Sequence, residues 1–360
     1  FLILFFTTTA KAQKEAETFN VDSTLYEYYQ RCQEYLLEPV VLSMSDTLFR
    51  MAGERHDERM QAVAIATRLD YYYFQGTNED SVIHYTNKVK EFAKATHQPK
   101  YYYFAWANRL VTYYLKTSRT NIALYEVQNM LKEAQKEDDK TGLSRCYNIM
   151  SQIYTIKRFD SMAFEWRLKE IELTEKYNIE NYNISQTYAQ IANYYISQKK
   201  QKEALRAVEK AISTANSSTQ QISAKLEYVN YYSKFGDFQA AEKILKECQI
   251  AFEQDKRLES IKKRLYNIEC LYYQQTRQYQ KALEAAEMQE KEEHRLSESI
   301  LSSSHYRTQG EIYQKMGNMN MAVKYLQMYI NTDDSLKIAN EQVASSEFAT
   351  LLNVEKLNAE

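Results

Sequence analysis

The sequence predicts an all-α fold, a right-handed superhelical solenoid built from antiparallel helical hairpins. Two observations support this prediction. The chain of 360 residues has only six Gly and two Pro, with 26% charged residues, a composition that favours helices over sheets. A tyrosine also stands nine residues before a small residue seven times, a fixed offset that is typical of repeated hairpins. The pairs are Tyr72/Ser81, Tyr114/Ala123, Tyr154/Ala163, Tyr195/Ala204, Tyr232/Ala241, Tyr273/Ala282 and Tyr313/Ala322.

The small members of these pairs follow one another at intervals of 42, 40, 41, 37, 41 and 40 residues. A constant inner offset inside a varying period indicates that the turn within each hairpin is fixed, whereas the loops between hairpins vary. We therefore place each tyrosine late on a first helix and each small residue early on a second helix, where the two backbones approach closely. We assign the tyrosine and the small residue of each pair to packing within the hairpin.

Helix breaks divide the chain into the expected elements. Pro39 separates the first two helices, and Pro99 opens a later one. The expected helices whose bounds can be read from such breaks span 22–37, 40–52, 81–96, 99–116, 141–157, 160–177, 183–198, 202–214, 220–234, 237–254, 257–276, 279–296, 300–315 and 319–331. Residues 13–54 then form a degenerate capping hairpin, and residues 55–331 form seven hairpins.

The N-terminal residues 1–12 are an apolar run that ends in Ala10-Lys11-Ala12. This pattern matches the apolar region and cleavage site of a secretory signal peptide, so we interpret it as the remnant of one and expect an exported protein. The alternative is a frayed hydrophobic first helix.

Residues 332–360 predict a further helix that carries no stop signal, since neither Gly nor Pro follows its apolar pattern. One interpretation is that this helix continues into sequence beyond Glu360. The other is a short capping helix, because terminal repeats need a polar outer face.

The clearest repeat unit has an aromatic residue, a glycine, a tyrosine, a Gly-Asn turn, an alanine and a bulky apolar residue. These are Tyr306, Gly310, Tyr313, Gly317-Asn318, Ala322 and Leu326. The unit resembles the tetratricopeptide repeat (TPR), and the resemblance covers residues 55–331. The period departs from that family, at about 40 residues rather than 34. The longer units resemble bacterial peptide-sensing regulators that carry stretched repeats of this kind.

The layout as a whole is similar to the periplasmic half of Bacteroidetes signalling proteins. That resemblance implies a periplasmic sensor, anchored in the inner membrane only through sequence beyond Glu360 and followed by a histidine kinase or a DNA-binding output. A free exported scaffold that mediates protein–protein interactions is the alternative.

The resemblance also implies that the first helices line a concave groove for a peptide or protein segment. Counted from each tyrosine, the groove positions lie nine, six and two residues before it and one after. An Asn amide both donates and accepts, which suits an extended backbone, and Arg side chains suit an anionic group. The alternative is that these residues are polar only because the groove is exposed to solvent. The proposed ligand-binding residues are Asn108, Arg145, Asn148, Gln152, Asn193, Asn230, Arg264 and Asn267.

Other functions find little support in the composition. A net charge of −2 and a pI near 6.3 argue against nucleic acid as a partner. The four cysteines, Cys32, Cys146, Cys248 and Cys270, lie too far apart for a metal site and are expected to be buried packing residues. The five histidines form no known catalytic or metal-binding motif. We therefore expect no enzyme activity, no metal and no cofactor.

Overall fold

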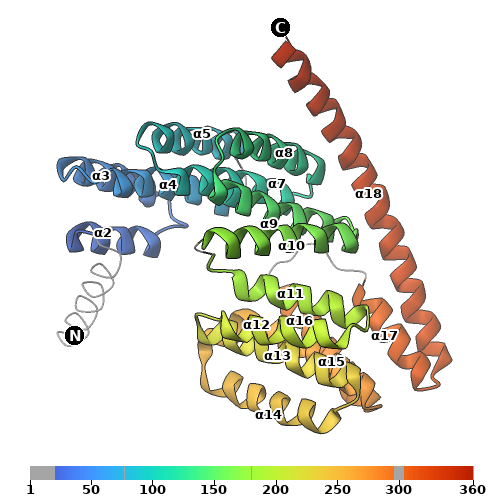
Figure 1. Cartoon of the computed structure of the whole chain (residues 1–360). Coiled ribbons are helices and arrows are strands. Elements are labelled where there is room, and N and C mark those ends of the chain that lie inside the picture. The colour runs from blue at the N-terminus through green and yellow to red at the C-terminus, as the bar shows by residue number, and fades with distance from the viewer. Residues whose placement is uncertain (1–20, 77, 180, 296–303, 360) are drawn as a thin grey trace. The chain divides into compact units, whose positions relative to one another are not determined.

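The computed structural model describes residues 21–76, 78–179, 181–295 and 304–359, and in these ranges it contains helices and no strands (Figure 1). The predicted all-α hairpin fold is confirmed. The segment 1–12, interpreted as a signal-peptide remnant, lies outside the described residues. The helices are α2 (Ser23–Glu34), α3 (Val40–Glu54), α4 (Glu58–Gln75), α5 (Glu79–Ala95), α6 (Pro99–Tyr103), η1 (Phe104–Val111), α7 (Thr112–Lys116), α8 (Thr120–Lys136), α9 (Lys140–Ile156), α10 (Asp160–Tyr177), α11 (Ile184–Ser197), α12 (Gln201–Ser213), α13 (Ser218–Phe235), α14 (Phe238–Gln254), η2 (Lys256–Ile261), α15 (Lys262–Gln275), α16 (Tyr279–Arg295), α17 (Ser304–Lys315) and α18 (Met319–Ala359).

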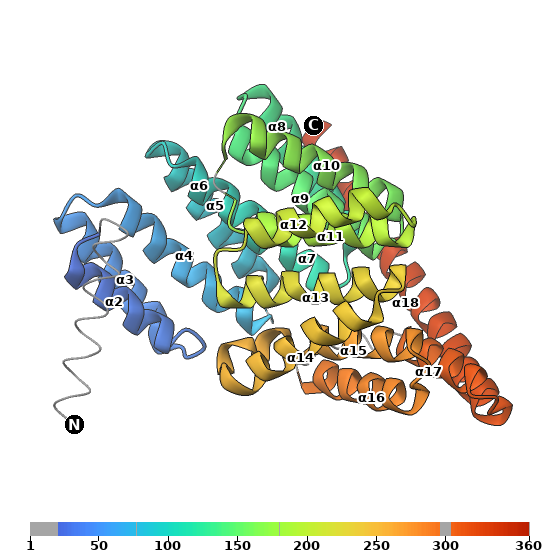
Figure 2. The ribbon, with the colours of Figure 1, turned by 60° about the horizontal axis from the view of Figure 1, so that its bottom comes forward.

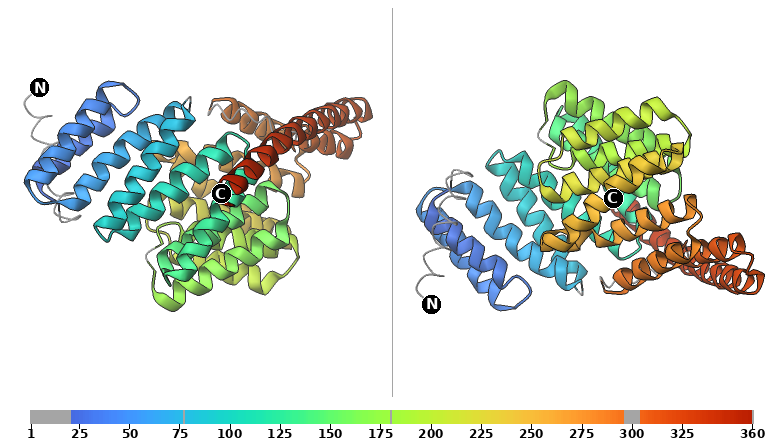
Figure 3. Two further views of the ribbon diagram at one scale, coloured as in Figure 1. Left: turned by 90° about the horizontal axis from the view of Figure 1, so that it is seen from above. Right: turned by 90° about the horizontal axis from the view of Figure 1, so that it is seen from below.

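The chain forms two compact units. Unit 1 comprises Phe1–Phe159 with Ala344–Glu360, and unit 2 comprises Asp160–Val343. In unit 1, α3, α4 and α5 pack in succession, as the blue helices of Figure 3 show. In unit 2, α11, α12 and α13 pack in the same way (Figure 2). First helices also contact first helices, with α6 against α9 in unit 1 and α13 against both α11 and α15 in unit 2. Each unit is therefore a stack of hairpins.

The tyrosine signature corresponds to one recurrent turn. The residue four places after each of the seven tyrosines has a positive φ, from 57° at Lys199 to 90° at Gly236. In the six turns whose residue five places after the tyrosine is described, the N–H of that residue donates to the tyrosine carbonyl at 2.8–3.0 Å. This is the Schellman arrangement that ends a helix. The left-handed residues are Gly76, Ser118, Arg158, Lys199, Gly236, Arg277 and Gly317.

The same turn explains the offset of nine residues. The residue five places after the tyrosine caps the second helix, and its carbonyl accepts from the N–H of the residue four places further on. That N–H belongs to the small residue in five hairpins, at 2.9–3.1 Å for Ala123, Ala204, Ala241, Ala282 and Ala322. These five alanines and Ala163 are at most 2% exposed. The offset is therefore the length of one helix stop followed by one helix start.

The first pair departs from this geometry, and the assignment of Ser81 as its small packing residue is wrong. Helix α5 takes Asn78 as its N-cap, six residues after Tyr72, and the amide of Ser81 donates to the Asn78 side chain at 2.9 Å. The fully buried residue of this turn is Val82. Helix α5 thus starts one residue later after its tyrosine than the other second helices do, and this moves the buried position from Ser81 to Val82. The spacing of residues in the sequence does not reveal this shift.

Two glycines mark places where the backbone meets a neighbouring side chain. A Cβ built on Gly310 would lie 2.8 Å from Cγ of Leu326, which lies on the second helix of the same hairpin. A Cβ on Gly142 would overlap the ring of Tyr103, which is 1% exposed. The glycine and the bulky apolar residue of the repeat motif are thus direct packing partners.

Three helices differ from the sequence prediction. The helix expected over 99–116 contains the π-helical segment η1, and the one expected over 257–276 begins as the 3₁₀ segment η2. The boundary expected between 331 and 332 is absent, because α18 runs unbroken from Met319 to Ala359 with no Gly or Pro to stop it. Among the described helices, none combines the length and apolar composition needed to cross a bilayer.

The four cysteines are all buried. Burial raises the pKa of the Cys32 and Cys248 thiols to about 11 and that of Cys146 to about 12. Such thiols stay protonated at neutral pH and pack as small apolar groups.

Candidate functional site

A groove of about 460 Å³ opens in unit 2. The N-terminal halves of three successive first helices, α11, α13 and η2–α15, form most of its wall. Helix α16 adds one glutamine. The lining residues are Ser185, Gln186, Ala189, Thr219, Gln220, Ser223, Ala224, Ser260, Ile261, Lys263, Arg264, Asn267 and Gln289.

Small residues make room for this groove. Ala189 and Ala224 lie on neighbouring first helices and are only 2% and 1% exposed, so they form a floor without long side chains. Around them the side chains are mainly hydroxyls and amides, together with Ile261 and the cations Lys263 and Arg264, and the described lining contains no carboxylate. A surface of this kind offers hydrogen bonds to a neutral polar ligand.

The side-chain amides that line the groove differ in whether they already form hydrogen bonds within the protein. Gln220 is committed to the fold, because its Nε2 donates to the carbonyl of Tyr182 and its Oε1 accepts from the amide of Asn216, both at 2.8 Å. Gln186 and Asn267, in contrast, have no side-chain hydrogen bond to any residue that the structure describes. Their donors and acceptors are available to a ligand.

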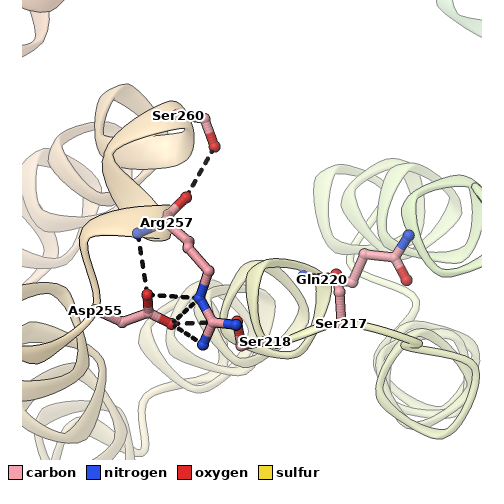
Figure 4. Close-up of polar contacts among 6 residues, drawn as sticks. All are labelled: Ser217, Ser218, Gln220, Asp255, Arg257 and Ser260. Atoms are coloured by element: carbon pink, nitrogen blue, oxygen red, sulfur yellow. Dashed lines mark hydrogen bonds and ion pairs between the residues drawn. The ribbon is translucent and has the colours of Figure 1, made fainter. Parts of the chain in front are cut away.

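Asp255 contacts two of the elements that line the groove, and Figure 4 shows its contacts with Arg257 and Ser218. Its carboxylate accepts from the backbone N–H of Arg257 at 3.0 Å, from the Arg257 guanidinium at 2.8 Å and from the Ser218 hydroxyl at 3.2 Å. Hydrogen bonds from Arg257 lower the pKa of Asp255 to about 2. Asp255 therefore joins the start of α13 to the start of η2 at neutral pH. Ser260, a lining residue, donates to the carbonyl of Arg257 at 3.2 Å.

The positive charge of Arg264, which the sequence analysis assigned to ligand binding, is compensated by a neighbouring carboxylate. Its guanidinium forms an ion pair with Glu227 of α13, and the Glu227 side chain is 1% exposed while that of Arg264 is 25% exposed. A buried carboxylate this close compensates the guanidinium charge. Arg264 therefore lines the groove as a nearly neutral pair rather than as a free cation.

The other proposed ligand-binding residues lie outside this groove. In unit 2, the Asn230 amide donates to Oδ1 of Asn193 at 2.7 Å. In unit 1, Arg145 donates to Oδ1 of Asn108 at 2.6 Å, and Gln152 donates to Oδ1 of Asn148 at 2.7 Å. Of the eight residues, the structure places only Arg264 and Asn267 in the lining.

Arg145 differs from Arg264 in its partner. Asn108 is neutral, and no carboxylate of the described residues lies within ion-pair distance of the Arg145 guanidinium. Burial lowers the pKa of Arg145, and its Nε is buried without a hydrogen-bond partner among the described residues. Arg145 thus keeps an uncompensated positive charge in unit 1. In the described residues there is also no cluster of three or more side chains that could hold a metal ion.

Solved structures of low sequence identity share the fold of this chain. No protein-family model and no curated protein matches the sequence. The apo form of the quorum sensor NprR from B. thuringiensis matches 89% of this chain and 91% of its own, with 14% identity and a TM-score of 0.54. A Rap protein complexed with Competence and Sporulation Factor matches 93% of this chain and 98% of its own, with 13% identity and a TM-score of 0.50. A tetratricopeptide repeat protein from Parabacteroides merdae matches 89% of this chain and 99% of its own, with 14% identity and a TM-score of 0.46.

The chain has a tetratricopeptide-repeat fold. The resemblance stated from the motif at Tyr306–Leu326 is confirmed at the level of the fold, which is what likeness at such low sequence identity establishes.

Sequence reasoning missed most of the groove-lining residues of this TPR array. It counted groove positions no further than nine residues before each tyrosine, whereas the lining extends one helical turn further back. Gln220 lies 12 residues before Tyr232, and Ser260 lies 13 residues before Tyr273. The signal that could have found them is the run of Ser, Thr, Gln and Ala at the starts of α11 and α13.

Proposed function

We propose that this TPR array binds a protein or peptide, and that the groove of unit 2 holds an extended segment of it. The observation that carries this proposal is the lining itself. Three successive first helices present mainly hydroxyls and amides around an alanine floor, and none of the described lining residues is a carboxylate. A peptide backbone has one donor and one acceptor per residue, and such a lining can satisfy both.

Gln186 and Asn267 are the residues that we assign to backbone recognition in the groove. Each carries a carbonyl oxygen and an NH₂ group with no partner in the described residues, so each can accept from one peptide N–H and donate to one peptide carbonyl. They stand on α11 and α15, on either side of α13.

The Asn193–Asn230 pair extends this surface along unit 2. Because Asn230 donates to Oδ1 of Asn193, the NH₂ group of Asn193 and Oδ1 of Asn230 remain available. The pair therefore offers one donor and one acceptor, which matches one peptide unit. The ladder of asparagines proposed from the sequence is retained here in the form of a joined pair.

For unit 1 taken by itself, Arg145 is the residue that we assign to an anionic group of a binding partner. Its charge has no carboxylate within ion-pair distance in the described residues, whereas Arg264 is already paired with Glu227. A carboxylate that reached Arg145 would gain a charge-assisted hydrogen bond.

The solved neighbours support a binding role. NprR is described as a quorum sensor, and the Rap structure is a complex with Competence and Sporulation Factor. A TPR array also buries its hairpin interfaces and leaves its first helices to present a binding surface.

The finer proposal is that the chain is the periplasmic sensor portion of a membrane-anchored signalling protein. It is supported by the apolar run before Ala10-Lys11-Ala12 and by the unbroken helix α18. Sequencing the gene beyond Glu360 tests it. An apolar span of about 20 residues followed by a kinase or DNA-binding domain is expected. A stop codon directly after Glu360 would instead favour the free exported scaffold.

The groove is tested by calorimetric titration with a peptide selected on an array of ten-residue sequences. The double variant Gln186→Ala with Asn267→Ala should bind about tenfold more weakly or worse, since each neutral hydrogen bond contributes roughly 0.5–1.5 kcal/mol. Its melting temperature should stay near that of the wild type, because neither side chain has a partner in the described fold.

The matched control is Gln201→Ala with Gln239→Ala, two exposed glutamines on second helices. It should bind like the wild type. Equal affinities for the groove variant and this control would refute the groove proposal. The variant Asn193→Ala with Asn230→Ala, titrated in the same way, tests whether the asparagine pair belongs to the binding surface.

A further inference from the structure

The C-terminal part of α18 makes a long-range contact within unit 1. Glu347 is 3% exposed, and its Oε1 accepts hydrogen bonds from the backbone N–H groups of Asn121 at 3.0 Å and Ile122 at 3.1 Å. Its Oε2 accepts from Nδ2 of Asn121 at 2.7 Å. One carboxylate is thus held by three N–H donors at the first turn of α8.

This contact is unusual for a repeat array, in which each hairpin touches its neighbours. Among the described residues, the other side-chain hydrogen bonds between hairpins join residues no more than about one repeat apart, from Tyr188 and Glu175, 13 positions apart, to Lys94 and Glu137, 43 positions apart. Glu347 and Asn121 are 226 positions apart. The contact therefore does not belong to the repeat pattern.

The first turn of α8 is well suited to hold a carboxylate. Its N-cap residue, Arg119, makes no side-chain cap hydrogen bond, because a guanidinium has no acceptor atom, and the Arg119 side chain instead donates to Glu79 at 2.7 Å. The unsatisfied N–H groups and the positive end of the helix dipole favour a negative charge at that place. Lys157 donates to Oδ1 of Asn121 at 2.9 Å, which directs the NH₂ group of Asn121 to Glu347.

We propose that Glu347 is a releasable latch, by which the segment 344–359 is docked on α8 and from which it can detach as a unit. All three donors come from the α8 hairpin, so they stay in place when the carboxylate leaves. The fold tolerates a second helix without a side-chain cap, as α12 shows after Lys200. Release should therefore free the C-terminal segment without unfolding the hairpins of unit 1. The latch does not depend on the groove of unit 2.

Hydrogen–deuterium exchange of the whole chain, followed by mass spectrometry, tests the latch. In Glu347→Ala, the amides of 120–123 and of 344–359 should exchange about tenfold faster or more, because charge-assisted hydrogen bonds are lost from both segments. Glu347→Gln keeps the shape but not the charge and should be intermediate. Asn121→Ala removes the side-chain donor and should also speed exchange in 344–359.

The control is Glu341→Gln, which changes an exposed carboxylate on the same helix and should exchange like the wild type. Two results would overturn the proposal. Unchanged exchange of both segments in Glu347→Ala would show that the contact holds nothing. Faster exchange throughout α4 to α9 would show that Glu347 is a structural cap of unit 1 and not a latch.

Discussion

Gly310 illustrates how single residues set the hairpin geometry. Its missing side chain lets the backbone of α17 approach Leu326, and a Cβ would also lie 3.3 Å from the backbone nitrogen of that leucine. A leucine side chain can move to another rotamer, but a backbone atom of a packed helix cannot move independently of its neighbours. A glycine is therefore required here for space and not for its dihedral freedom.

We predict that Gly310→Ala lowers the free energy of unfolding by about 1–3 kcal/mol, because the added methyl group overpacks the hairpin. Urea denaturation followed by circular dichroism measures the change. Gly53→Ala is the matched control. There a Cβ would lie 3.0 Å from Nε2 of Gln61, the far end of a flexible side chain. That variant should be neutral or up to about 1 kcal/mol more stable, owing to the higher helix propensity of alanine. Equal loss in both variants would remove the packing explanation.

At the scale of the element, the recurrent unit is a helix stop joined to a helix start. Three of the seven turns place a glycine at the left-handed position, and the other four use Ser118, Arg158, Lys199 and Arg277. A left-handed conformation costs a non-glycine residue roughly 1–2 kcal/mol. The hydrogen bond to the tyrosine carbonyl and the packing of the hairpin hold these residues there.

Opposite substitutions at two equivalent turns should therefore have opposite effects. Gly236→Ala should destabilise the chain by about 1 kcal/mol, since φ is 90° and nothing within 4 Å would obstruct the added Cβ. Lys199→Gly removes the strain of a left-handed lysine but gives the unfolded chain more conformational freedom, which opposes the gain. The net effect should be a stabilisation of about 0.5–1 kcal/mol. Melting temperatures of both variants test this pair. A loss of stability in Lys199→Gly would contradict the strain argument.

For the molecule as a whole, the repeat organisation limits how far a perturbation spreads. Contacts within each unit lie mainly inside a hairpin, as between α11 and α12, or between consecutive hairpins, as between α12 and α13. In such a stack, stability is close to a sum of local terms between neighbours. Damage to one hairpin should therefore stay near it.

Gly142→Ala provides the test, because its Cβ would overlap the ring of Tyr103 in unit 1. We expect hydrogen exchange to become faster in α6 to α9, where the overpacked residues lie, and to stay at the wild-type rate in α13 to α16. Peptide-resolved mass spectrometry distinguishes these regions. Uniformly faster exchange in both would show that the chain opens as one cooperative unit.

The fold class and the hairpin register could be predicted from the sequence because both depend on short stretches of chain. The helix stop after Tyr232 and the start before Ala241 fall within ten residues, and the hydrogen bonds that make them are local. The prediction was wrong at Ser81, where one additional loop residue moves the buried position to Val82. It also missed the continuity of α18, although neither Gly nor Pro stands between Met319 and Ala359 to end the helix.

The candidate site, in contrast, was decided by tertiary structure. The sequence by itself determined which residues repeat, since spacing along one helix sets which positions share a face. It could not determine that Glu227 neutralises Arg264, that Asn230 binds Asn193, or that Glu347 reaches α8. The members of these pairs are 37, 37 and 226 positions apart. Their distances in space follow from how hairpins stack and where α18 runs, and no local pattern of residues encodes that.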